Sequence, residues 1–94
     1  MSTPTLSIVI STIDKNFEKF LKNFQFEKLK NADEVIIIVQ GAEKLVRHSA
    51  LASFNVIVEK SYGLSLSRNI GIENSSSDFI WFLDDDVYLF DYSI

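Results

Sequence analysis

The sequence predicts an α/β domain in which a parallel sheet of about four strands, in the order 3-2-1-4, carries helices on both faces. Three observations indicate it: four short apolar segments, helix-like segments between them, and polar residues where the apolar segments end. Of the 94 residues, 47% are hydrophobic and 13% aromatic, which is enough for a core and excludes a disordered tail. The length suits one small domain or part of a larger one.

The first half of the chain predicts two strands and two helices. Residues 6–10 form a β-branched apolar run that suits a strand covered on both sides. The apolar residues that follow have the i, i+3, i+4, i+7 spacing of an amphipathic helix: Phe17, Phe20, Leu21 and Phe24. Asp14 is placed to cap that helix. Residues 34–40 predict the second buried strand, and residues 43–52 predict a short helix after it.

The second half predicts a third strand over residues 55–59, a helix from Ser65 to about Ser75, and a fourth strand over residues 78–83. Ser65 is placed to cap the helix, and Gly71 within it indicates a close contact between helix and sheet. Trp81, in the middle of the fourth strand, is expected in the core. The fourth strand is apolar on both faces, yet in the order 3-2-1-4 it lies at the edge of the sheet. There Trp81 or Phe82 would be partly uncovered, so we expect the chain to self-associate through this strand.

Composition and charge exclude several classes of protein. Without cysteine, the chain has no disulfide, no thiolate zinc site and no cysteine nucleophile. A net charge of −4 argues against a nucleic-acid partner. The longest apolar runs have five residues, so no transmembrane segment is expected, and the first ten residues do not predict a signal peptide. Residues 61–94 hold six acidic residues and one Arg, whereas the preceding sixty hold seven acidic and eight basic residues.

Three consecutive carboxylates, Asp84, Asp85 and Asp86, follow the fourth predicted strand. Ligands of parallel α/β sheets bind beyond the carboxyl ends of the strands, where Thr12 and Gln40 are also expected. Each close pair of these carboxylates costs about 1 kcal/mol in water, a cost that a Mg²⁺ ion would remove. Alternation along an extended chain would put Asp84 and Asp86 on one face and Asp85 on the other. A solvated acidic turn is the alternative.

Three segments carry a resemblance to a known family. They are IVISTIDK at residues 8–15, GLSLSRNIGI at residues 63–72, and DFIWFLDDD at residues 78–86. Together, in this order and spacing, they resemble family 2 glycosyltransferases of the GT-A fold. Ser11 stands where the family usually has proline. The acid motif alone is a weak signal, whereas the helix, strand and acids together are specific.

The resemblance implies the Rossmann-like, N-terminal half of a GT-A domain, with residues 1–94 as the nucleotide-sugar-binding part. The implied reaction transfers a sugar, such as a hexose, from a nucleotide-sugar donor to a hydroxyl of a glycan or lipid-linked acceptor, as in polysaccharide biosynthesis. It also implies Mg²⁺ or Mn²⁺ as cofactor and a location in the cytoplasm or peripherally at the inner face of the membrane. The acceptor site and the catalytic base would lie beyond residue 94, so the isolated chain is expected to be inactive.

The resemblance also assigns roles to individual residues near the acid motif. Asp86 matches the metal-binding acid, and Asp84 matches the first acid, which lies near the ribose of the donor and reaches the metal through water. Thr12 matches a residue that lines the base pocket. Asp14 and Asp85 are expected among the nucleotide-sugar-binding residues.

Two further residues, Arg68 and Gln40, are compared with the family: Arg68 matches its pattern, whereas Gln40 departs from it. Arg68 matches the Arg of an Arg-Asn pair and is expected to hold a phosphate or the acidic rim; a helix-surface salt bridge is the alternative. Gln40 stands where the family has an Asp that pairs with the base, and its amide is able to hydrogen-bond a uracil edge.

Two other classes of function compare with a transferase, and the sequence argues against the first of them. A phospho-acceptor domain of the receiver type needs an acidic pair after the first strand and an Asp after the third, a pattern that Ser11–Asp14 and Glu59–Lys60 do not provide. The other alternative is a non-catalytic, truncated module that binds a nucleotide, a cation or another protein.

Overall fold

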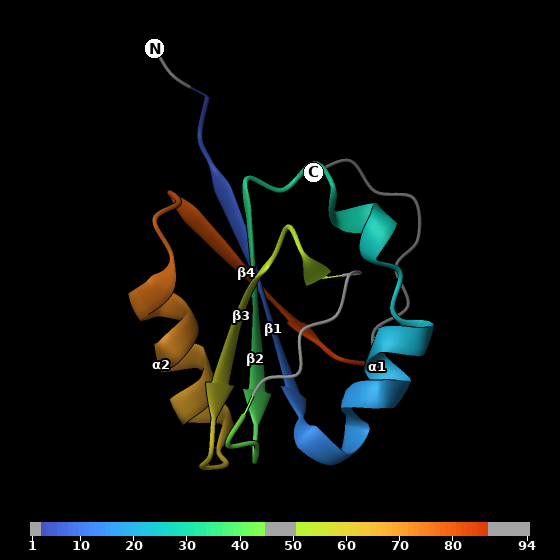
Figure 1. Ribbon diagram of the computed structural model, residues 1–94. Helices are drawn as coiled ribbons and strands as arrows, with labels where there is room; N and C mark the ends of the chain where they lie inside the picture. The colour runs from blue at the N-terminus through green and yellow to red at the C-terminus, as the bar shows by residue number, and fades with distance from the viewer. Residues whose placement is uncertain (1–2, 45–50, 87–94) are drawn as a thin grey trace.

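The computed structural model describes residues 3–44 and 51–86. Four strands form one parallel sheet in the order β3-β2-β1-β4 (Figure 1). The strands are β1 (Leu6–Ile13), β2 (Glu34–Gln40), β3 (Asn55–Glu59) and β4 (Phe79–Asp84). Both the predicted strand order and the parallel pairing of β2 with β3 are confirmed.

Helices cover both faces of the sheet, as the sequence predicts (Figure 1). The 3-10 helix η1 (Asp14–Asn16), helix α1 (Phe17–Asn23) and the 3-10 helix η2 (Phe26–Leu29) follow β1. Helix α2 (Leu64–Asn74) lies on the opposite face, between β3 and β4 in the chain. Within the described ranges, no helix is long and apolar enough to span a membrane.

Alternating residues of the central strands build two cores, one on each face of the sheet. On the α1 face, Ile8, Ile10 and Ile37 pack with the predicted aromatic stripe, of which Phe17, Phe20 and Phe24 are all buried. On the α2 face, the buried residues are Val9, Ile36 and Ile38. The continuous apolar runs of β1 and β2 are therefore explained by burial on both sides.

Gly71 lets α2 approach the sheet closely. A Cβ atom at this position would lie 2.5 Å from Cγ1 of Val9, which is itself 1% exposed. The structure thus confirms the expected helix–sheet contact. It also explains a glycine inside a helix, where glycine costs about 1 kcal/mol relative to alanine.

The edge strand β4 is less buried than the sequence predicts. Phe79 and Trp81 are 61% and 40% exposed, whereas Ile80 and Phe82 pack against the core on the α2 face. The prediction that Trp81 is a core residue is therefore wrong, because among the described residues α1 packs on the sheet mainly at β1 rather than over Trp81. The expectation that Trp81 or Phe82 would be partly uncovered is confirmed.

Both predicted helix caps are wrong. Strand β1 continues to Ile13 because Ser11–Ile13 pair with β2, so Asp14 begins η1 and the N-cap of α1 is Asn16. Helix α2 begins at Leu64, after Gly63 with φ of 145°, a conformation that favours glycine, and no side chain caps it. The predicted helix over residues 43–52 lies mostly outside the described residues, since positions 45–50 are not described.

Candidate functional site

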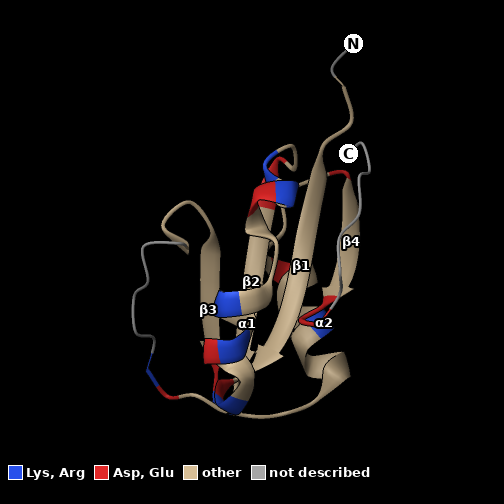
Figure 2. Cartoon of the chain, turned by 90° about the vertical axis from the view of Figure 1, so that its right-hand side faces the viewer, with Lys and Arg blue, Asp and Glu red and all other residues tan. Residues whose placement is uncertain are grey.

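Parallel pairing brings the polar ends of three strands to one edge of the sheet. Ser11 lies opposite Asp84 in the register of β1 and β4, and Ile13 lies opposite Gln40 in the register of β1 and β2. Charged residues are concentrated on the helices and at strand ends, while β1 carries none along its length (Figure 2). The predicted polar edge is therefore present at the carboxyl ends of the strands.

One hydrogen bond ties the acidic segment to the end of β1. The Thr12 hydroxyl Oγ1 donates to Oδ2 of Asp85 over 2.8 Å, although the two residues are 73 positions apart. Thr12 is only 2% exposed. A buried hydroxyl needs a partner, and this carboxylate supplies one.

The three acids do not lie along one extended strand. Strand β4 ends at Asp84, and Asp85 and Asp86 form a turn, so the alternation expected from an extended chain does not reach them. Asp85 is half-buried, while Asp84 and Asp86 are exposed. We call Asp84–Asp86 the acidic turn. The expectation that Asp85 lies on the opposite face from Asp86 is therefore wrong, because both residues line the same cavity.

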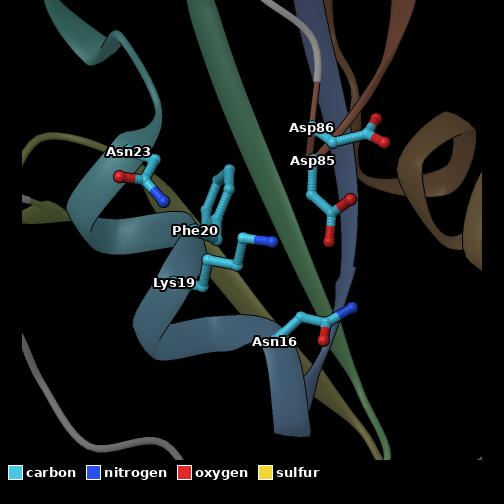
Figure 3. Close-up of a pocket in the computed structure, with 6 residues that line it drawn as sticks. All are labelled: Asn16, Lys19, Phe20, Asn23, Asp85 and Asp86. Carbon is cyan, nitrogen blue, oxygen red and sulfur yellow. The ribbon is translucent and has the colours of Figure 1, made fainter.

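That cavity has a volume of 390 Å³ and lies between the acidic turn and the segment formed by η1 and α1 (Figure 3). Its lining residues are Asn16, Lys19, Phe20, Asn23, Asp85 and Asp86. In Figure 3 the Lys19 side chain extends toward Asp85. Sequence reasoning missed the contribution of α1. The available signal was the i, i+4 spacing of Lys19 and Asn23, which places these two residues on one side of α1, with Asn16 just before the helix.

Gln40 lies at the same edge and is 6% exposed. Its amide Nε2 donates to the carbonyl oxygen of Gly63 over 2.8 Å, which fastens the loop before α2 to the end of β2. Ser67 of α2 is fully buried and hydrogen-bonded to Ser11 of β1. These two contacts fix the beginning of α2 against the sheet.

Arg68, the next residue of α2, has an aromatic partner. Its guanidinium carbon lies 5.5 Å from the ring centroid of Phe82 in β4, which is a cation–π contact. Asp14 is exposed in η1, at the end of β1, and is not among the residues that line the cavity. Of the predicted site residues, the structure thus brings together Thr12, Asp85 and Asp86 most directly.

The acidic turn fits a hard divalent cation by the chemistry of its donors. Carboxylate oxygens suit Mg²⁺ and Mn²⁺, and Mg²⁺ usually takes one or two carboxylates and completes its shell with water and phosphate. Among the described residues there is no ready group of three metal-ligating side chains. A cation at this turn would complete its coordination with water or phosphate oxygens.

Comparison with known families agrees with the motifs and the fold. Residues 7–94 match the family described as glycosyl transferase family 2. The chain belongs to this family. The match includes all three segments that carry the resemblance, and the all-parallel sheet in the order 3-2-1-4 is consistent with a Rossmann-like GT-A fold. No curated protein and no solved structure gives a match.

Proposed function

We propose that this family 2 glycosyltransferase binds its nucleotide-sugar donor at the carboxyl edge of the sheet, and that residues 1–94 are the donor-binding part of a metal-dependent transferase. The observation that carries the proposal is the hydrogen bond from Thr12 to Asp85, which holds the acidic turn against the end of β1. Ligands of open α/β sheets bind at this edge.

The acidic turn is the proposed metal site. Asp84 and Asp86, which are both exposed, would hold Mg²⁺ or Mn²⁺ together with oxygens of the donor diphosphate. When bound, the ion would stabilise the negative charge that develops on the leaving diphosphate. Asp85 has a different task, because its carboxylate already accepts the Thr12 hydroxyl and so orients the turn.

The nucleoside is proposed to lie over the ends of β1 and β2. Thr12 and Gln40 would line the base pocket, with Asp14 at its outer side in η1. Because Gln40 donates its Nε2 to Gly63, its carbonyl oxygen Oε1 is the atom proposed to face the base. Arg68, held over Phe82, is proposed to lie beside the phosphates.

The proposed acceptor and cellular setting of the reaction are taken from the family. The proposed acceptor is a hydroxyl of a glycan or a lipid-linked glycan, and the proposed setting is polysaccharide biosynthesis at the cytoplasmic side of a membrane. Transfer itself would need the acceptor site and a base, neither of which the proposal assigns to residues 1–94.

Calorimetric titration of the chain with nucleoside diphosphates tests the proposal. We expect at least one of UDP, GDP or ADP to bind in Mn²⁺ and to bind much more weakly in EDTA. Asp86→Asn should remove the dependence on Mn²⁺, while Glu73→Gln, on the exposed surface of α2, should behave as wild type. Equal binding with and without Mn²⁺, or no effect of Asp86→Asn, would contradict the metal site.

A further inference from the structure

The cavity beside the acidic turn has walls of opposite charge. Asp85 and Asp86 line one side, and Lys19, with the amides of Asn16 and Asn23, lines the other. Figure 3 shows the Asp85 carboxylate facing Lys19 and the Asp86 carboxylate extending away from it. Lys19 is exposed, and its side chain extends across the cavity toward Asp85.

The two walls favour different ligands. Carboxylates attract a divalent cation and repel a phosphate, whereas an ammonium group attracts a phosphate and repels a cation. A cation–diphosphate pair presents both charges, so it is complementary to both walls at once. Without the ammonium group of Lys19, a diphosphate at this turn would meet negative side chains wherever the cation did not shield it.

We propose that Lys19, assisted by the side-chain amide of Asn16, binds phosphate oxygens of the donor diphosphate across the cavity from the acidic turn. The proposal rests on the proposed function and adds α1 as the second side of the phosphate site. An ammonium group offers three N–H donors and an amide offers two, and hydrogen bonds from a cation to phosphate are among the stronger ones.

This arrangement predicts that removing Lys19 has opposite effects on two ligands. Lys19→Met should weaken pyrophosphate binding in the presence of Mn²⁺ by about fivefold, the ratio that corresponds to about 1 kcal/mol for an exposed charge. The same substitution should slightly strengthen the binding of Mn²⁺ alone, because a positive charge leaves the neighbourhood of the carboxylates. Both effects should shrink at high salt.

Lys22 provides a matched control. It is also an exposed lysine of α1, but it does not line the cavity, so Lys22→Met changes the net charge by the same amount elsewhere on the helix. Lys19→Arg keeps the charge and should retain most of the pyrophosphate affinity. Thermal unfolding of each variant checks that α1 still folds.

The experiment is calorimetric titration of the 94-residue chain with Mn²⁺ alone and with pyrophosphate at saturating Mn²⁺. Support requires a loss of pyrophosphate affinity in Lys19→Met, none in Lys22→Met, and recovery in Lys19→Arg. Absence of pyrophosphate binding by the wild-type chain overturns the inference, as does an equal effect of the two methionine variants. If Asp86→Asn loses Mn²⁺ while Lys19→Met binds pyrophosphate normally, the inference alone fails; if Asp86→Asn changes nothing, the proposed metal site fails.

Discussion

The hydroxyl of Thr12 donates a hydrogen bond of 2.8 Å to the carboxylate of Asp85, which joins the end of the first strand to the turn after the last. The contact is possible because β1 and β4 are adjacent and parallel, with Ser11 opposite Asp84. It connects the buried framework of the sheet with the acidic turn. The position of the turn therefore depends on a residue that is itself almost fully buried.

Replacing Thr12 should loosen the acidic turn. Thr12→Val keeps the shape of the side chain but removes the hydroxyl, and we expect a loss of about 1–2 kcal/mol in the free energy of unfolding. Thr12→Ser, which keeps the hydroxyl, should lose less. Urea denaturation measures both variants, and an equal loss in the two would show that packing rather than the hydrogen bond matters at this position.

Two substitutions in the acidic turn should have separable effects. Asp86→Asn should abolish Mn²⁺ binding and leave stability unchanged or slightly raised, because Asp86 is exposed and its repulsion with Asp85 is relieved. Asp85→Asn should lower stability, because it weakens the acceptor of the Thr12 hydroxyl. Mn²⁺ titration and thermal unfolding of both variants distinguish these outcomes; matching profiles would contradict the division of roles.

Gly71→Ala should destabilise the domain. The new Cβ would lie 2.5 Å from Cγ1 of Val9. Overpacking costs about 1–3 kcal/mol, and at so short a distance we expect the cost to exceed the gain of about 1 kcal/mol in helix propensity. Val9→Ala makes room for the methyl group, so the double variant should be more stable than the sum of the single effects predicts. Chemical denaturation of the four proteins measures this coupling, and strict additivity would contradict the contact.

Self-association through β4 remains a prediction. Among the described residues, β4 pairs with β1 alone, and Phe79 on it is 61% exposed. An edge strand with apolar side chains tends to pair with another chain, and we expect dimers or larger assemblies at micromolar concentration. Phe79→Lys should shift the chain toward monomer in sedimentation velocity. A wild-type chain that sediments as a monomer at these concentrations would contradict the expectation.

The strands could be predicted from sequence because each is a short run of apolar, mostly β-branched residues, and their alternation with helices restricts the topology. Asp14 was wrongly expected to cap α1 because β1 runs on to Ile13 and the 3-10 helix η1 then precedes α1. Ser65 was wrongly expected to cap α2 because the helix already begins at Leu64, directly after Gly63. The burial of Trp81 depends on what covers the edge of the sheet, which local pattern does not report.

The candidate site was predictable only in part, for a similar reason. Thr12 and the acids could be placed on one edge because parallel strands end together. Lys19 could not, because its place beside Asp85 and Asp86 depends on how α1 packs against β1 next to the acidic turn, an arrangement of segments far apart in the chain. The acid motif could therefore be found from the sequence, whereas the α1 residues that line the cavity with it could be found only from the packing of the helix.

The central claim is that the donor binds at the carboxyl ends of the strands. The most direct test measures amide chemical shifts while the chain is titrated with Mg²⁺ and with the nucleoside diphosphate that binds best. We predict shift changes at Thr12, Gln40 and the acidic turn. Ser7 and Glu34, which hydrogen-bond to each other at the opposite edge, should not change. Changes confined to Ser7 and Glu34, or none at the acidic turn at saturating nucleotide, would contradict the account.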